Sequence, residues 1–399
     1  MKQTIAHLLP DYNPFPPRYP AGTELRVEQV AQRQQRYRPV VVCGWFAGQA
    51  ESEAVGTMNI RRIRVGRAYR RLFQKITRVD PLPYGERMWR VIQNEGAALL
   101  HIHNEPKLLA GMQARLRHDP RPVIVHVANE KPLPAGAMSR VTQWVACSRY
   151  IARWLTDHNG IDPNLVEVIY TGVDSRARAP RWQTSDVARN LIRERFGVNR
   201  PDVTVLLFAG RLVREKGVVE LLDAFEQLRA VHGDKLELLI AGNVRDSDDP
   251  RNEKAVYGKA VVARIEQTPG ARWVGSLPPQ DIHDFLIAGD IFVLPSLWAD
   301  PFPTVMLEAA AAGIPIVAAA RGGMTEFLAD CPGFDADMRP EYPESLSSAI
   351  ERYLLDEESR RVAGNWLRAR VEAQFDWSRV CNDMEDLYDR LLKPGIPRP

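Results

Sequence analysis

The stretch DIFVLPSLWADPFPTVMLEAAAAGIPIVAAARGGMTE, residues 290 to 326, is the most informative part of this chain. The segment DIFVLP predicts a buried strand, and the Pro-rich turn SLWADPFP ends that strand. TVMLEAAAAG has the Ala-rich composition and the final Gly of a short helix, and IPIVAA predicts a second buried strand. The stretch therefore predicts a strand-helix-strand unit of a parallel sheet.

Two carboxylates belong to this unit, Asp300 in the predicted turn and Glu308 in the predicted helix. They lie just after a strand's carboxyl end, where open α/β sheets bind ligands. Free backbone N–H groups at a helix start favour phosphate, and a nearby acidic residue commonly holds ribose hydroxyls. The residues at the junction of this turn and the helix are Phe302, Pro303, Thr304 and Val305. The ligand that this pattern implies is a nucleotide.

Two cations follow another predicted strand, VTVLLF, in the stretch FAGRLVREKGVVELL. Arg211 and Lys216 lie in a Gly-bounded turn between that strand and a helix. Arg binds phosphate oxygens bidentately and Lys supplies a compact charge, so the pair suits a diphosphate. The alternative is that both are solvated surface cations. The carboxylates of the first unit favour the diphosphate interpretation.

Strands and helices alternate along the whole chain, which predicts an α/β protein with two domains. We expect a first domain over residues 1–175, with short buried strands such as PVVVCGWF, ALLHIHN and PVIVHVAN. The polar, Pro-bearing segment 175–186 predicts a linker. Residues 187–376 are expected to form the second, nucleotide-binding domain.

The composition is that of an average soluble protein, with 45% hydrophobic and 26% charged residues among 399. The cysteines are scattered, which indicates free thiols in a reducing, cytoplasmic compartment. We expect neither a membrane span nor a signal peptide, because no apolar run is long enough and Pro10 comes early. The four cysteines are Cys43, Cys147, Cys331 and Cys381.

Positive charge is concentrated in the first half of the chain. Residues 1–174 carry 24 Lys and Arg against 15 Asp and Glu, whereas the remainder carries 29 against 35. The segment RRIRVGRAYRRLFQKITR, residues 61–78, has eight basic side chains and no acid. It is either a solvated face or a surface for anionic lipid or a phosphorylated acceptor, contacted through Arg67, Arg70 and Arg71. The nucleotide-site pattern argues against nucleic acid as the partner.

The stretch around residue 300 resembles the signature of the retaining glycosyltransferases of family 4, which carry two glutamates separated by seven residues. Glu308 matches the second glutamate, which binds the nucleotide ribose, and Asp300 replaces the first, which lies near the donor sugar. Arg211 and Lys216 match the cations that bind the donor phosphates in place of a metal. The resemblance thus implies a donor site that includes Phe302 to Val305, and no metal or other cofactor.

The same resemblance implies the GT-B fold, with two Rossmann-like domains whose parallel sheets face each other across a deep cleft. It also implies that the last helix, residues 377–393, returns to the first domain. In that domain PAGTELRVEQ places Gly22 and Thr23 at a helix start. They form either an ordinary N-cap or, as in the family, a loop that approaches the donor phosphates.

Two histidines, His103 and His126, each end a strand of the first domain, and a strand-end histidine is often a hydrogen-bonded structural residue. His126 matches the family histidine beside the donor sugar and the reacting hydroxyl, where it would accept a proton or a hydrogen bond. We expect His103 on the acceptor side. Asp335 and Asp337 spell a DxD, a motif that binds metal in other glycosyltransferases but is frequent by chance.

The segment AYRRLFQKITRVDPLPYGERM, residues 68–88, resembles the bacterial lipopolysaccharide core N-acetylglucosaminyltransferases. This resemblance implies transfer of N-acetylglucosamine or glucose from a UDP-sugar to a lipopolysaccharide core or other lipid-linked glycan, with an α-linkage. It implies an enzyme peripheral to the inner face of the plasma membrane. The alternatives are a mannosyl or glucosyl transferase acting on a polyprenyl diphosphate carrier, a GDP-sugar donor, or a non-catalytic nucleotide-sugar-binding protein.

Overall fold

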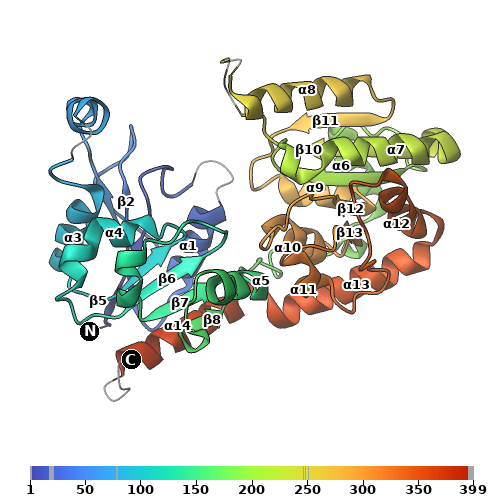
Figure 1. Ribbon diagram of the computed structural model, residues 1–399. Coiled ribbons are helices and arrows are strands. Elements are labelled where there is room, and N and C mark those ends of the chain that lie inside the picture. Colours follow the sequence, from blue (N-terminus) through green and yellow to red (C-terminus); the bar gives the residue numbers. More distant parts are fainter. Residues whose placement is uncertain are drawn as a thin grey trace. The chain divides into compact units, whose positions relative to one another are not determined.

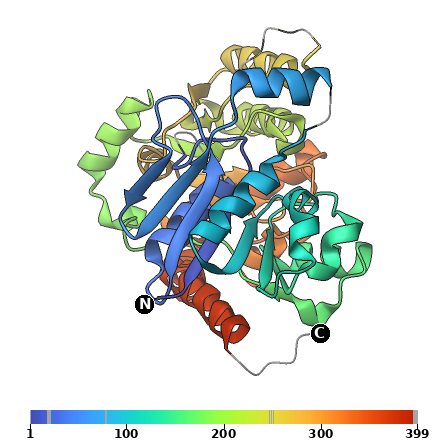
Figure 2. The same cartoon turned by 90° about the vertical axis from the view of Figure 1, so that its left-hand side faces the viewer.

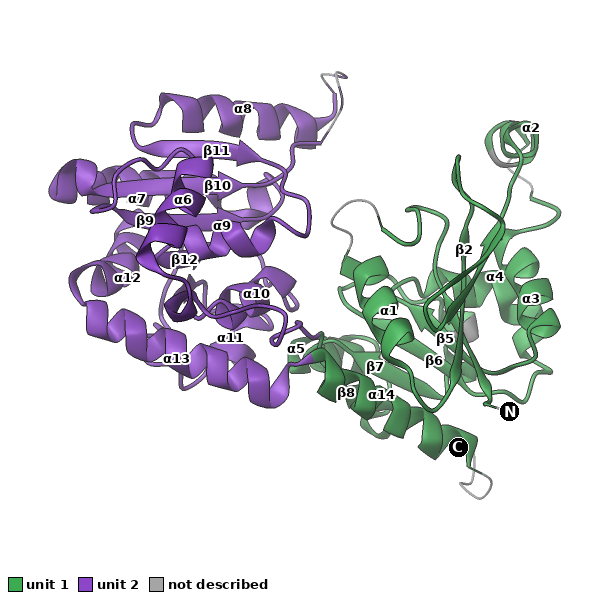
Figure 3. Cartoon of the chain, turned by 180° about the vertical axis from the view of Figure 1, so that it is seen from behind, with its two compact units in different colours: residues 1–171, 377–399 green, residues 172–376 purple. Residues whose placement is uncertain are grey.

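The computed structural model of the chain describes residues 2–17, 22–77, 80–245, 247, 249 and 251–393, without the side chains of residues 74 and 137. The chain forms two compact units (Figure 3). Unit 1 consists of residues 1–171 and 377–399, and unit 2 of residues 172–376. Residues 175–186, which we expected to be a linker, belong to unit 2.

Unit 1 is built on an eight-stranded sheet with the order β3-β4-β2-β1-β5-β6-β7-β8. Neighbouring strands are parallel except for the antiparallel pair β3 and β4. The strands are β1 (Thr4–Leu8), β2 (Arg38–Gly44), β3 (Ser52–Val55), β4 (Met58–Ile63), β5 (Ala97–His103), β6 (Val123–Val127), β7 (Gln143–Ala146) and β8 (Val166–Val168).

The helices of unit 1 include the last helix of the chain, which contacts α1 and β5. Figure 3 shows this helix, α14, beside the strands of unit 1. The helical elements are α1 (Gly22–Arg33), α2 (Arg67–Tyr69), η1 (Arg70–Ile76), α3 (Tyr84–Asn94), α4 (Lys107–Leu116), η2 (Ala135–Arg140), α5 (Arg149–Arg153), η3 (Trp154–His158), η4 (Pro163–Leu165) and α14 (Trp377–Leu392).

The helix α14 is held by both apolar and polar contacts. Its inner face, which includes Met384 and Leu387, packs in one cluster with alternate residues of the strands, such as Ile5 and Leu99. The buried Glu385 accepts hydrogen bonds from the backbone N–H groups that follow α1, those of residues 35 and 36, at 2.9 and 2.8 Å. These contacts explain why residues far apart in the sequence fold as one unit.

Unit 2 is built on a parallel five-stranded sheet with the order β11-β10-β9-β12-β13 (Figure 1). The strands are β9 (Thr204–Ala209), β10 (Leu236–Ala241), β11 (Ala271–Gly275), β12 (Ile291–Leu294) and β13 (Ile316–Ala318). The helical elements are η5 (Arg181–Gln183), α6 (Asp186–Arg195), η6 (Arg214–Lys216), α7 (Val218–His232), η7 (Gly233–Lys235), α8 (Glu253–Gln267), α9 (Ile282–Ala288), α10 (Thr304–Ala311), α11 (Met324–Leu328), α12 (Pro343–Leu355) and α13 (Glu357–Gln374).

This strand order has a topological switch point between β9 and β12. The chain proceeds outward from β9 to β11 on one side and from β12 to β13 on the other. Crossovers on opposite sides leave a crevice at the carboxyl ends of the two central strands, where α/β sheets bind ligands. We therefore expect the ligand site of unit 2 in the segments that follow β9 and β12.

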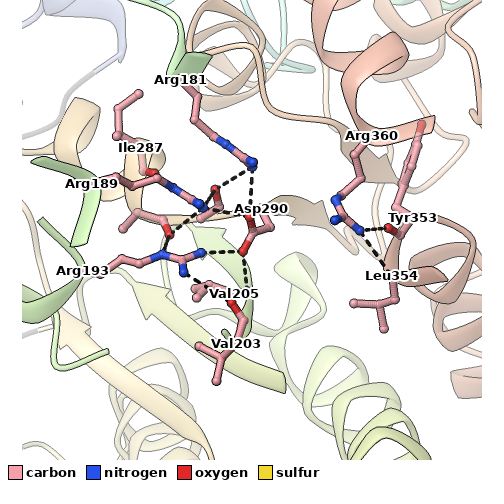
Figure 4. A network of polar contacts seen from close by, with 12 residues as sticks. Arg181, Arg189, Arg193, Val203, Val205, Ile287, Asp290, Tyr353, Leu354 and Arg360 are labelled. Carbon is pink, nitrogen blue, oxygen red and sulfur yellow. Dashed lines mark hydrogen bonds and ion pairs between the residues drawn. The ribbon is translucent and has the colours of Figure 1, made fainter. Parts of the chain in front are cut away.

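A buried carboxylate joins these two central strands to the beginning of unit 2 (Figure 4). Asp290, directly before β12, accepts hydrogen bonds from Arg181, Arg189 and Arg193 at 2.7 to 3.0 Å. Its Oδ2 also accepts from the backbone N–H of Val205 in β9 at 2.8 Å. The segment 181–193, part of which we expected to be a linker, is thus fixed to the sheet.

Within the described part of the chain, every helix is too short or too polar to pass through a bilayer.

Candidate active site

Two loops meet at the switch point of unit 2, one after β9 and one after β12. Gly217 ends the first loop in a left-handed conformation, with φ of 68°. A Cβ there would lie 1.9 Å from the carbonyl oxygen of Pro295, so only glycine allows the loops to approach so closely. This contact brings Lys216, one residue earlier, beside the turn that follows β12.

Lys216 and Asp300 form an ion pair across these loops. Both side chains are largely buried, and the Lys216 ammonium also lies 5.8 Å from the centre of the Trp298 ring. Arg211, at the start of the same loop, is exposed. The structure thus brings together the cation and the carboxylate that the sequence analysis assigned to the donor, although 84 residues separate them.

The turn containing Asp300 is fixed by the loop after β13. The backbone N–H of Gly323 donates to the Asp300 carbonyl at 2.8 Å. Phe302 and Pro303 are buried in this turn, whereas Thr304 is exposed at the first position of α10. The first N–H groups of a helix lack intrahelical acceptors and carry partial positive charge, so the start of α10 suits an anionic ligand.

Glu308 lies in the middle of α10 and receives a hydrogen bond from an arginine that the sequence analysis did not identify. Nη2 of Arg178 donates to Oε1 of Glu308 at 3.1 Å. Burial raises the pKa of Glu308, and the Arg178 charge opposes that shift. Arg178 was missed because it lies 130 residues earlier, in the polar segment that we expected to be a linker. In the sequence, Arg178 is distinguished only as a cation among Pro and polar residues, which does not indicate a partner.

The sheet of unit 1 has its own switch point, between β1 and β5. Thr23, in the first turn of α1, accepts a hydrogen bond from Asn104, which follows β5, at 3.2 Å. Gly22 is exposed, and a Cβ on it would meet no neighbour within 4 Å. Residues 20 and 21 of the expected glycine-bearing loop lie outside the described part. Gly22 and Thr23 therefore occupy the carboxyl edge of the sheet, as a ligand loop would.

The strand-end histidines belong to a buried layer on one face of this sheet. His7, His101, His103 and His126 lie on β1, β5 and β6 and are at most 1% exposed. His7 Nδ1 lies 2.9 Å from His103 Nε2, and His101 Nδ1 lies 2.7 Å from the Tyr388 hydroxyl of α14. His103 and His126 are therefore both interior residues of unit 1, and the roles that the sequence analysis gives them stay predictions.

This histidine layer is electrically neutral. Burial lowers the pKa of His7 to about 4 and holds the pKa values of His101, His103 and His126 well below their usual range. Ring nitrogens of His7, His101 and His103 lie within 4.8 Å of one another, close enough to suggest a metal site. However, the charge of Arg26 disfavours a dication there, as it disfavours protonation of His101, His103 and His126.

The basic segment 61–78 does not form one uniform surface. Arg61 and Arg62 lie in β4, where the partly exposed Arg61 is paired with Glu95 and the buried Arg62 donates to the carbonyl of Phe15. The second part forms the helical segment α2 and η1 at the periphery of unit 1 (Figures 1 and 2). On this segment Arg70 is bound to Asp11 at 2.8 Å, whereas three cations are exposed. The exposed cations are Arg67, Arg71 and Lys75.

Comparison with known proteins identifies the class that this fold and site define. Residues 192–369 match the model of the glycosyl transferases group 1, and residues 21–177 match that of glycosyltransferase family 4. The glycosyltransferase from Rickettsia africae superposes with a TM-score of 0.78 over 99% of this chain and 100% of its own, at 17% identity. The protein is a glycosyltransferase of the GT-B fold.

The chain belongs to family 4 of these enzymes. It is 28% identical to the lipopolysaccharide 1,2-N-acetylglucosaminetransferase of Salmonella typhimurium over 97% of this chain and 98% of that protein. The Alr3699/HepE protein of Anabaena, solved in complex with UDP, superposes with a TM-score of 0.74 over 97% of this chain and 100% of its own, at 18% identity. The predicted family and fold are therefore confirmed.

Proposed function

We propose that this glycosyltransferase moves N-acetylglucosamine or glucose from a UDP-sugar to a lipopolysaccharide core or related glycolipid, with retention and without a metal. The observation that carries the proposal is the arrangement of Lys216, Asp300 and Glu308 around the switch point of unit 2. The similarity to a lipopolysaccharide N-acetylglucosaminetransferase over almost the whole chain supports the acceptor class.

In the proposed reaction, charge develops on the diphosphate as the bond to the sugar breaks. Lys216 and Arg211 would stabilise that charge, because preorganised cations act most strongly where charge appears in the transition state. Asp300 would face the sugar, and Glu308 would accept hydrogen bonds from the ribose hydroxyls. Attack by the acceptor hydroxyl from the side of the departing diphosphate would give the α-linkage.

The nucleotide assignment is tested by calorimetric titration of UDP. Glu308→Gln keeps the shape of the side chain but removes the charged acceptor, so we expect UDP binding to weaken by about 1.5–3 kcal/mol. Equal affinity in wild type and variant would remove the ribose assignment. A thermal-shift screen with UDP-, GDP- and ADP-sugars identifies the donor, and release of UDP in the presence of purified acceptor distinguishes an enzyme from a sugar-binding protein.

The helical segment 67–76 supports contact with an anionic membrane that holds the acceptor. Leu72 and Ile76 are 48% and 65% exposed and lie four residues apart, hence on one side of the helical segment. The exposed cations Arg67, Arg71 and Lys75 accompany them. Exposed apolar side chains flanked by basic ones are typical of helices that bind the surface of a bilayer.

Replacing Arg67, Arg71 and Lys75 with Gln is expected to reduce sedimentation with anionic vesicles and to raise the acceptor KM, with UDP affinity unchanged. Each basic side chain near an anionic surface contributes about 1 kcal/mol, so three changes predict a weakening of about a hundredfold. The charge-matched control replaces the exposed Arg90, Arg117 and Arg153 of the same unit. If the two triple variants behave alike, the segment is only a solvated surface.

A further inference from the structure

The backbone around Arg178 is held by hydrogen bonds to other segments of unit 2. Val173 donates its N–H to the carbonyl of Phe375 at 2.9 Å, and the Ser175 hydroxyl donates to Asp376 at 2.6 Å. The guanidinium of Arg368, in α13, donates to the carbonyls of Ser175 and Arg178 at 2.7 and 2.6 Å. The segment therefore has a fixed path, and the Arg178 side chain starts from a defined position.

The same guanidinium of Arg368 also donates to the carbonyl of Ala311, the last residue of α10. One side chain thus binds both the segment carrying Arg178 and the helix carrying Glu308. The Arg178 side chain is 18% exposed and that of Glu308 24% exposed, so their contact is sheltered from water. Such a charge-assisted hydrogen bond is stronger than one between neutral groups.

Arg178 is the direct hydrogen-bond partner of the Glu308 carboxylate, and other titratable groups nearby lie on the helix α9. His283, on the neighbouring helix α9, has its pKa lowered by burial and by the charges of Arg178 and Arg368, which disfavours its protonated form. Asp284 opposes that shift in His283. Burial raises the pKa of Glu308, and the charge of Arg178 lowers it.

We propose that Arg178 is a positioning residue for the nucleotide ribose, acting through Glu308. Its hydrogen bond to Oε1 keeps Glu308 in the carboxylate form and fixes the side chain, so that the carboxylate can accept from both hydroxyls of a ribose diol. A protonated carboxyl group would instead present a donor to one of these hydroxyls. This inference rests on the proposed binding of a nucleoside diphosphate at Glu308.

The test is calorimetric titration of UDP into wild type, Arg178→Gln, Arg178→Met and Arg178→Lys at pH 6, 7 and 8. Without the guanidinium the pKa of Glu308 rises further, so its carboxylate is lost as pH falls. We expect the Gln and Met variants to lose UDP affinity, relative to wild type at the same pH, as the pH is lowered from 8 to 6. Arg178→Lys should restore the wild-type profile, because it keeps the charge.

Two controls separate this role from a structural one. Arg176→Gln removes an exposed cation from the same segment and should leave the pH profile unchanged. In Glu308→Gln, adding Arg178→Gln should create no new pH dependence. The inference would be overturned if the UDP affinity of the Gln and Met variants changed with pH in parallel with wild type. It would also be overturned by a pH-independent loss of UDP affinity that Arg178→Lys does not restore. Failure of wild type to bind UDP would instead overturn the proposed function.

Discussion

Lys216→Ala is expected to lower turnover about a hundredfold or more while the fold survives, because it removes a preorganised charge from the leaving diphosphate. The buried ion pair with Asp300 places the Lys216 ammonium at the switch point before any donor arrives. Turnover is measured as UDP released from the UDP-sugar identified by thermal shift. Lys216→Arg, which keeps a cation in the loop, should retain more activity than Lys216→Ala.

The loss of Lys216 also leaves the carboxylate of Asp300 without its partner, which could by itself disturb the site. Recovery of turnover in the double variant Lys216→Ala, Asp300→Asn would assign the loss to the unpaired carboxylate. If the missing charge is responsible, the double variant stays inactive although its buried carboxylate is neutralised. Arg211→Ala should show a similar loss, since its exposed guanidinium is free to reach phosphate oxygens.

Arg200→Ala is the matched control for these charge removals. Arg200 has a side chain that is 41% exposed, pairs with Asp202 and Asp234, and precedes β9, whereas Lys216 and Arg211 follow that strand. Activity should therefore be unchanged in this variant. Near-normal turnover in both Lys216→Ala and Arg211→Ala would show that the phosphates bind elsewhere.

The strand-helix-strand unit of residues 290–326 could be predicted because its signals are local. Apolar runs, a Pro-rich turn and an Ala-rich segment indicate β12, α10 and β13 without reference to the rest of the chain. The parallel pairing of β12 with β13 agrees with that prediction. The positions of Asp300 and Glu308 near a strand's carboxyl end follow from the same local pattern.

Features that depend on distant partners could not be predicted in this way. The strand β4 was missed because its Arg61 and Arg62 resemble a charged surface, and only the structure shows that Arg61 is paired with Glu95 and that Arg62 is buried against the carbonyl of Phe15. Arg178 was overlooked for the same reason, since a cation in a polar segment carries no sign of its partner. Similarly, the alternation of side chains along β5 predicts on which face of the sheet His103 lies. It does not predict which helices cover that face.

Asp290→Asn is expected to destabilise unit 2 by about 3–5 kcal/mol, the usual effect of breaking a buried ion pair by removing one partner. Burial alone would raise the pKa of Asp290, but the charges of Arg189, Arg181 and Arg193, with the Val205 N–H, hold it below its usual value. An asparagine in the same rotamer would turn an NH₂ group toward arginine donors and leave guanidinium charges uncompensated.

Urea unfolding followed by tryptophan fluorescence measures this effect on the full chain. With a slope of about 2–3 kcal/mol/M, the loss predicts a midpoint for the unit 2 transition lower by roughly 1–2 M. The control, Asp284→Asn, removes the carboxylate of an exposed pair with Arg195 and should change stability by less than about 1 kcal/mol.

The stability difference between Asp290→Asn and wild type, measured as a function of pH, shows whether the charge of Asp290 causes it. Because the folded pKa of Asp290 is lowered, its contribution is fully present above the unfolded pKa and is lost as pH falls through the folded pKa. The stability gap should therefore be constant near neutral pH and close in acid. A gap that persists in acid would mean that packing of the side chain, and not its charge, joins the segment 181–193 to β9 and β12.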